Sequence, residues 1–271
     1  MAENTFSAAA NPDLANDLIQ KAVVETKEPV QPAEIIAPFD NLVTLPGGYV
    51  NAAGEVIKTV EVRELTGRDE EAISKSNSLG RTLLTIINRA TVKIGDEPAN
   101  EQLLDKMFSG DRDAVLLGIY KATFGNTCEI DVVCQSCEDY RTVAIDVNDD
   151  IPVAPLADVL TESSFTVQGK KNEFLVHLPD GTAQKEIYLN MDKTQAELTS
   201  ILLEKTILEI NGNPILGKSQ IQNLGLADRK AVIDALAERN FGPQFDVIQV
   251  NCPECGEELE VPLSLGALFR F

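Results

Sequence analysis

Four of the chain's five cysteines form two Cys-x-x-Cys pairs that lie far apart in the sequence. Cys134 and Cys137 form the first pair, and Cys252 and Cys255 form the second. Two cysteines separated by two residues can bind one Zn²⁺ from a single tight turn, with each sulfur about 2.3 Å from the metal. Two such pairs complete a tetrahedral site of four thiolates. The spacing therefore predicts one structural zinc that joins two distant segments of the chain.

The residues around each pair predict the turn of a β-hairpin. Alternating apolar residues stand on both sides of each pair, as in IDVV before and TVAIDV after Cys134 and Cys137. Such runs are typical of strands. In the second pair, Pro253 favours the turn and Gly256 permits a positive φ, whereas the first pair has neither residue.

Two other interpretations of the cysteines remain open, a redox dithiol and unlinked buried thiols. A redox Cys-x-x-Cys pair is expected at the start of a helix, where the helix dipole lowers the thiol pKa. Strand-like residues flank both pairs here, which favours metal binding. The fifth cysteine, Cys128, has no partner by spacing and is predicted to be a small buried residue.

Composition restricts the classes of partner. The 271 residues include 23 basic and 43 acidic ones, for a net charge of −20, which argues against a surface for nucleic acid. No apolar run approaches the roughly 20 residues of a membrane span, and the first residues lack the order of a secretory signal. We therefore expect no nucleic-acid or membrane partner, synthesis in the cytoplasm, and a reducing compartment in which metal binding is favoured over disulfides.

Residues that could carry catalysis are scarce. His177 is the one histidine, and no nucleophile motif accompanies it. No glycine-rich phosphate-binding loop is present. A catalytic zinc needs an open coordination position, and four cysteines leave none. The sequence thus predicts no enzyme, no catalytic residue and no small-molecule substrate.

Strand and helix signals predict an α+β fold. Residues 1–38 are predicted to form a flexible arm with one weak amphipathic helix over 12–24. Residues 39–150 are predicted to form a first subdomain. Its elements are a hairpin that turns at Leu45-Pro46-Gly47-Gly48, a helix capped by Thr66, further helices, an Asp-Arg helix ending at Gly125, and the first Cys-x-x-Cys hairpin.

The same order of signals recurs in residues 165–271, after a predicted linker at 151–164. Asp111-Arg112 recurs as Asp228-Arg229 and Phe124-Gly125 as Phe241-Gly242, both at the same offset. A second Leu-Pro-x-Gly turn is predicted between strands within 174–189. Chance similarity is the alternative, but the order predicts two related subdomains, each a β-hairpin plus helices plus a Cys-x-x-Cys zinc-knuckle hairpin.

Several of these motifs together resemble a known family. They are LPGG at Leu45, VRELTG at Val62, GDRD at Gly110, the Phe124-Gly125 pair, a Cys-x-x-Cys hairpin, and the ending CPECG…LSLGALFRF. The set resembles the T-even-type baseplate proteins of contractile-tailed bacteriophages, the group around the baseplate hub subunit. This chain departs from the family in its apparent doubling and in its plain CQSC turn.

The resemblance implies a structural or assembly role in the virion tail baseplate, with other tail and baseplate proteins as partners. We expect a structural component. The alternatives are an assembly chaperone absent from the mature virion and a cytosolic metal-dependent enzyme. The arm and the apolar ending at 263–271 could contact neighbours, and the ending could equally pack on the protein's own core.

Overall fold

The computed structural model describes residues 13, 16, 41–245 and 247–269. The predicted arm at 1–38 and the helix at 12–24 therefore lie outside the described residues, apart from Asp13 and Asn16. The described residues from 41 onward form one compact unit. Within the described ranges, no helix has both the length and the apolar character needed to cross a membrane.

An antiparallel four-stranded sheet opens the fold, in the order β1-β2-β3-β4, and two helices stand between its second and third strands. Thr66 and Asp69 form a capping box at the first of these helices, which begins at Gly67 as predicted. Along the sequence the elements are β1 (Leu42–Val50), β2 (Val56–Val62), α2 (Gly67–Ile73), α3 (Leu79–Ala90), β3 (Thr91–Ile94) and β4 (Glu97–Pro98).

Two more helices and a hairpin complete this half: α4 (Glu101–Lys106), α5 (Ser109–Phe124), β5 (Thr127–Cys134) and β6 (Asp139–Asp146). Helix α5 is buried over most of its length and packs against β1, β2 and α3. It ends at Phe124 and is followed by its C-cap, Gly125, whose φ of 86° leads the chain out of the helix.

The order of elements then recurs. A second four-stranded sheet has the order β8-β9-β10-β11, and two helices again stand between its second and third strands. The bounds are β7 (Val153–Ala154), α6 (Val159–Glu162), β8 (Ser164–Gln168), β9 (Glu173–His177), α7 (Gly181–Leu189), α8 (Gln195–Thr206), β10 (Ile207–Ile210), β11 (Asn213–Pro214), α9 (Lys218–Gln222), α10 (Leu226–Glu238), β12 (Gly242–Pro243), β13 (Val247–Asn251), β14 (Glu258–Pro262) and α11 (Leu265–Leu268).

The predicted turn at Leu45-Pro46-Gly47-Gly48 is wrong. These residues lie inside β1, where the register against β2 shifts between Thr44 and Tyr49. The chain turns instead at Asn51, whose side chain accepts hydrogen bonds from the backbone N–H groups of Ala53 and Glu55. The Pro-Gly-Gly run therefore forms an irregularity within a strand, a position that glycine tolerates as readily as a turn.

The second Leu-Pro-x-Gly turn is also wrong. The hairpin of the second half is β8–β9, which turns before Glu173, and the residues from Gly181 onward form helix α7. Asp180 caps that helix by accepting a hydrogen bond from the N–H of Ala183. An aspartate followed by glycine suits a helix start as well as a turn. Here the hydrogen bond made by the Asp180 side chain favours the helix start.

The predicted linker, 151–164, is packed into the fold. Strand β7 pairs with β12, and the side chains of Ile151 and Val159 are buried. The prolines at 152 and 155 flank this short strand, in agreement with their restriction to edges and ends of strands.

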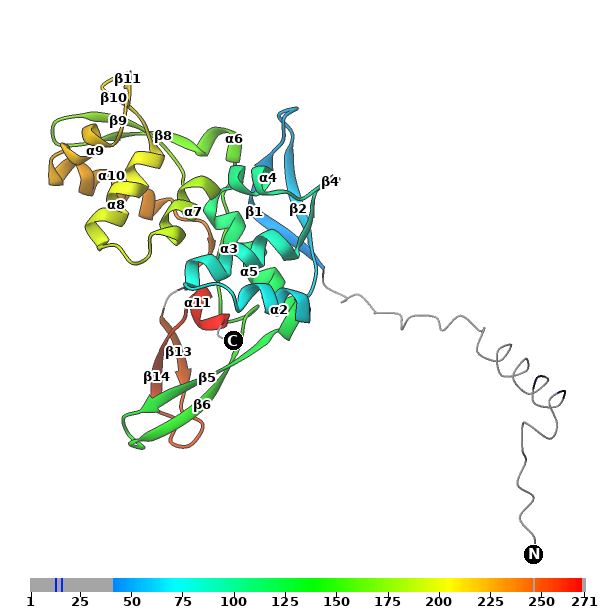
Figure 1. The fold of residues 1–271 in the computed structure, drawn as a ribbon. Coiled ribbons are helices and arrows are strands. Elements are labelled where there is room, and N and C mark those ends of the chain that lie inside the picture. Colours follow the sequence, from blue (N-terminus) through cyan, green and yellow to red (C-terminus); the bar gives the residue numbers. More distant parts are fainter. Residues whose placement is uncertain (1–12, 14–15, 17–40, 246, 270–271) are drawn as a thin grey trace, which may run out of the picture. The chain divides into compact units, whose positions relative to one another are not determined.

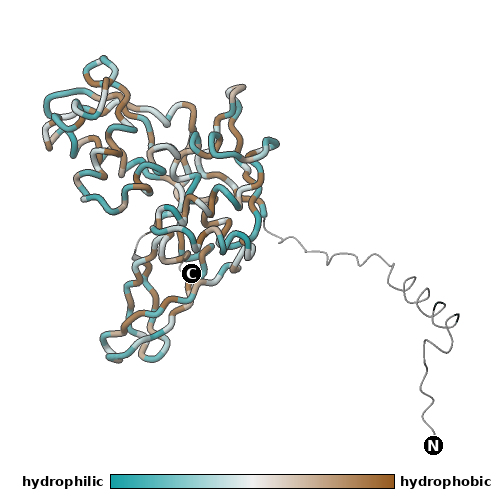
Figure 2. The backbone as a smooth tube through the Cα atoms, in the orientation of Figure 1, coloured by the Kyte–Doolittle hydropathy of each residue, from teal (hydrophilic) through white to brown (hydrophobic). Residues whose placement is uncertain are grey.

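Two clusters of buried apolar residues hold the described fold together. The larger one joins the first sheet, α3 and α5 to both Cys-x-x-Cys hairpins and α11. The smaller one lies mainly among β8, β9, α8, β10 and α10 and includes Phe108 from the first half. Figure 2 shows hydrophobic segments gathered toward the centre of the fold and hydrophilic ones at its outer turns. In the apolar ending, Leu265, Leu268 and Phe269 are buried in the larger cluster, so this segment packs on the protein's own core.

Candidate metal centre

Two hairpins place the four cysteines. Strand β5 ends at Cys134, and β6 begins two residues after Cys137. Cys252 directly follows β13, and Cys255 stands in the turn before β14. Figure 1 shows the two hairpins extending on the same side of the helices. The prediction that each pair occupies the turn of a hairpin agrees with this strand pairing.

Each turn contains one residue with positive φ. Gly256 has a φ of 74°, in agreement with its predicted part in the turn, and Glu138 has a φ of 54°. A non-glycine residue rarely adopts this conformation and does so at some energetic cost. The CQSC turn thus reaches the same chain reversal without glycine.

The four sulfurs lie together although they come from segments more than 100 residues apart. The Sγ atoms of Cys134 and Cys255 are 3.6 Å apart, and those of Cys137 and Cys252 are 3.9 Å apart. All four lie within 4.8 Å of one another. Four thiolates at about 2.3 Å from one tetrahedral metal ion would be separated by about 3.8 Å. The spacing of the sulfurs therefore fits a four-thiolate metal site, and it is too long for disulfide bonds.

Hydrogen bonds stabilise a thiolate at Cys252. The backbone N–H groups of Cys255 and Glu254 point at its sulfur and lower its pKa to about 6, against the effect of burial. Hydrogen bonding to the Cys255 sulfur and burial instead raise the pKa of Cys137, to about 12. The lowered pKa of Cys252 favours its thiolate, which is the form in which a cysteine binds a metal ion.

A positive charge lies beside the cysteines. The Arg141 guanidinium opposes the rise in the pKa of Cys137, and its Nη1 donates to the Asp139 carboxylate at 2.9 Å. Four thiolates around a divalent cation carry two net negative charges, which a neighbouring arginine offsets. Arg141 is therefore a charge-balancing residue of the site, and the spacing of the cysteines did not indicate it.

The cluster lies where the hydrophobic core meets the surface. Cys134 and Cys252 are buried and belong to the larger apolar cluster, Cys137 is half-buried, and Cys255 is exposed. The exposed side gives a metal ion access to the cluster. If all four sulfurs bind one ion, no coordination position remains for a substrate.

The other residues singled out in the sequence lie apart from this cluster. Cys128 is buried in β5 as a small apolar residue, in agreement with its prediction. His177 ends β9, where it is half-buried beside Phe108, and burial lowers its pKa.

The repeated Asp-Arg pair has a structural role that the sequence did not predict. Asp111 is fully buried and accepts hydrogen bonds from the N–H groups of Gly47 and Gly48 in β1. Asp228 is equally buried and accepts from the N–H of Lys171 and the side chain of Asn172, in the β8–β9 turn. In each half the aspartate thus ties its helix to the first hairpin.

The two arginines also act alike. Arg112 donates to the carbonyl of Leu104, and Arg229 donates to the carbonyl of Ile221. Each carbonyl lies in the short helix before the arginine's own helix. In the sequence, the only sign of these roles was that the Asp-Arg pair recurs at a constant offset. The groups that bind the aspartates and arginines could not be identified without the fold.

The model of the family described as T4 bacteriophage base plate protein matches residues 50–178. This range contains Cys134 and Cys137 and ends before Cys252 and Cys255. No curated protein and no solved structure matches the chain. The match confirms the resemblance carried by the sequence motifs: residues 50–178 are similar to the T4-type base plate proteins of bacteriophages.

Proposed function

We propose that this chain is a structural component of a contractile phage tail baseplate, in which it binds neighbouring tail proteins. The observation that carries the proposal is the family match over residues 50–178. The strongly acidic composition gives such a component a surface suited to basic partners. A position near the baseplate hub is the finer form of this proposal.

We further propose that Cys134, Cys137, Cys252 and Cys255 together bind one structural Zn²⁺. The mutual distances of the sulfurs support this assignment, and four sulfur ligands favour Zn²⁺ over oxygen-preferring cations. The ion would join two hairpins that are separated in sequence, so its binding free energy would contribute to folding. It would keep an interaction surface rigid and would carry out no chemistry.

The first experiment is the metal content of the purified chain, with Cys134→Ser and Cys128→Ala as a matched pair of variants. We expect one zinc per wild-type chain and per Cys128→Ala chain, because Cys128 lies outside the cluster. Cys134→Ser should lose the zinc and melt on the order of 10 °C lower, since three thiolates hold the ion far less well. Wild-type protein purified under reducing conditions without zinc would contradict the metal proposal.

The second experiment locates the chain in the particle. Mass spectrometry of purified virions should detect it at a constant ratio to other tail proteins if it is a structural component. Its absence from finished particles, together with its presence in assembly intermediates, would favour the assembly-chaperone alternative. A metal-dependent enzyme would require turnover that Cys255→Ser abolishes while the fold persists, and the four-sulfur geometry gives that reading the least support.

A further inference from the structure

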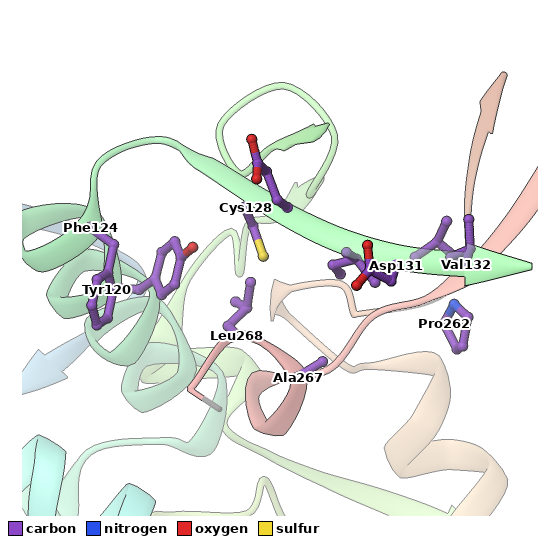
Figure 3. A pocket seen from close by; sticks show the side chains of 11 residues that line it. Tyr120, Phe124, Cys128, Asp131, Val132, Pro262, Ala267 and Leu268 are labelled. Atoms are coloured by element: carbon purple, nitrogen blue, oxygen red, sulfur yellow. The ribbon is translucent and has the colours of Figure 1, made fainter. Parts of the chain in front are cut away.

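A groove runs along one side of β5, outside the cysteine cluster. It has a volume of about 530 Å³. Strand β5 forms one wall, and the end of β14 together with α11 forms the opposite wall. In Figure 3, Cys128 and Leu268 face each other across it, and the rings of Tyr120 and Phe124 stand at one end. We call this feature the β5 groove.

The backbone of β5 has an unpaired edge. In the part of the chain that the structure describes, β5 pairs with β6 alone. The carbonyl of Asn126 accepts a hydrogen bond from the N–H of Val147, so Asn126 and every second residue after it direct their backbone groups toward β6. The residues between them, Thr127, Glu129 and Asp131, must direct theirs away from β6.

A side chain already uses one group on this edge. Tyr120 Oη donates to the carbonyl of Thr127 at 3.3 Å. That contact confirms the direction of the Thr127 backbone. The backbone groups of Glu129 and Asp131 follow it along the same edge, and both residues line the groove.

Side chains on β5 alternate in character as regularly as its backbone groups alternate in direction. Cys128 is buried, and Ile130 and Val132 are half-buried, on the side that packs toward the core. Glu129 and Asp131 are exposed on the other side. A strand laid along this edge would therefore meet apolar and acidic side chains in turn.

The two hairpins around the groove are strongly acidic. Residues 127–146 and 247–262 contain nine acidic residues and a single basic one, Arg141. The residues lining the groove include Glu129 and Asp131 and no lysine or arginine. An incoming strand is thus favoured if it carries positive charge.

We propose that the β5 groove binds an extended segment of another protein, which adds as a strand to the free edge of β5. The segment would alternate basic and apolar side chains, with the basic ones beside Glu129 and Asp131 and the apolar ones toward Ile130 and Val132. Main-chain hydrogen bonds would give affinity, and the alternating side chains would give specificity. The inference deepens the proposed function, because it names the kind of tail-protein segment that the chain would bind.

A second copy of this chain is the less suitable occupant. Its own β5 edge would bring Glu129 and Asp131 of one copy beside the same carboxylates of the other. Like charges opposite each other in neighbouring strands destabilise the pairing. The charge pattern therefore selects a basic partner over self-association.

The test uses the zinc-loaded full chain and a fluorescent synthetic peptide of alternating lysine and valine, matched to the eight residues of β5. Fluorescence anisotropy should show saturable binding. A peptide of alternating glutamate and valine should not bind. Methylation of alternate backbone nitrogens on the edge that faces β5 should abolish binding by the lysine peptide, while methylation of the other edge should leave it intact.

A pair of charge-reversal variants tests the position. Glu129→Lys should weaken binding by about tenfold, because an attractive cross-strand pair becomes a repulsive one. Glu186→Lys makes the same change on an exposed face of α7 and should bind as wild type. Both substituted side chains are exposed, so folding should persist in each.

Hydrogen exchange resolved by residue gives an independent readout. The amides of Glu129 and Asp131 should exchange quickly in the free chain and slowly in the complex, whereas those of Cys128 and Ile130 are already bonded to β6. Equal binding by Glu129→Lys, or unchanged exchange at Glu129 and Asp131, would overturn the proposal. Self-association by ultracentrifugation that Glu129→Lys strengthens would instead assign the edge to a second copy.

Failure of this proposal is distinguishable from failure of the proposed function. A chain that holds zinc and is present in virions, but does not bind the peptide, would refute strand addition alone. A chain absent from both virions and assembly intermediates would refute the baseplate role, whatever its peptide affinity.

Discussion

Individual buried carboxylates in this protein bind groups from other parts of the fold. Asp69 is fully buried, where Arg63 and Arg89 form ion pairs with it and Thr66 adds hydrogen bonds. Hydrogen bonding from Arg63 holds the pKa of Asp69 well below its usual range. Asp111 and Asp228 accept backbone hydrogen bonds at equivalent places in the two halves. These residues connect elements that are distant in sequence.

Asp111→Ala should destabilise the chain by about 3 kcal/mol, because the buried N–H groups of Gly47 and Gly48 lose their acceptor. Urea denaturation measures the change. Asp96→Ala removes an exposed aspartate from the β3–β4 turn and should alter the free energy of unfolding by less than about 0.5 kcal/mol. Equal effects of the two substitutions would contradict the proposed tie between α5 and β1.

Asp113 should give the stability a dependence on pH. Burial raises its pKa to about 6, against a hydrogen bond from Gln184. Because this folded-state pKa lies above the unfolded value of about 3.9, the neutral side chain is favoured in the fold. Its stabilisation is complete below about pH 4 and is lost as pH rises through about 6, a change of up to about 3 kcal/mol.

Asp113→Asn tests that dependence, since asparagine cannot ionise and its oxygen can still accept from Gln184. The melting temperature of the variant, relative to wild type, should rise steadily between pH 4 and pH 7. Asp69 works in the opposite direction, because its lowered pKa makes it stabilising above about pH 4. Asp69 is present in both the variant and the wild type, so its contribution cancels in the difference between their melting temperatures. If that difference did not change with pH, Asp113 would not titrate in this range.

Elements recur in this chain as an ordered set. Each half of the chain contains, in the same order, a hairpin, two helices, a short second hairpin and two further helices. The two hairpins of each half form its four-stranded sheet, and a Cys-x-x-Cys hairpin comes after the two further helices. We propose that residues 39–150 and 165–271 are related subdomains that arose by duplication, joined by 151–164. The equivalent bonds of Asp111 and Asp228, and of Arg112 and Arg229, support this proposal.

The elements of the two halves meet closely. A Cβ atom on Gly80 in α3 would lie 2.0 Å from the carbonyl oxygen of Tyr188 in α7. Gly80→Ala should therefore destabilise the chain by about 2 kcal/mol or more, because backbone on both sides must shift. Gly67→Ala, at the first position of α2, meets no atom within 4 Å and should be neutral or slightly stabilising. Differential scanning calorimetry of the pair would decide, and an unaffected Gly80→Ala would argue against close α3–α7 packing.

At the scale of the whole molecule, the larger apolar cluster spans both halves. It includes residues of the first sheet, of both Cys-x-x-Cys hairpins and of α11. The four cysteines lie at the edge of this shared core. If the proposed zinc binds there, its loss should loosen the contact between the two hairpins, which are far apart in the sequence. Unfolding of the metal-free chain should therefore begin at these hairpins.

The sequence by itself determined features that depend on neighbouring residues. Alternating apolar runs predicted both Cys-x-x-Cys hairpins, and caps such as Thr66 and Gly125 predicted where helices begin and end. The conformation of the two Leu-Pro-x-Gly segments, in contrast, was decided only by the tertiary structure. Glycine suits a turn, an irregular strand or a helix start, and the choice depends on partners such as Asp111, which lies 64 residues from Gly47. The convergence of four sulfurs was predicted from spacing, but the distances that fit a metal ion come from the packing of the two hairpins on one core.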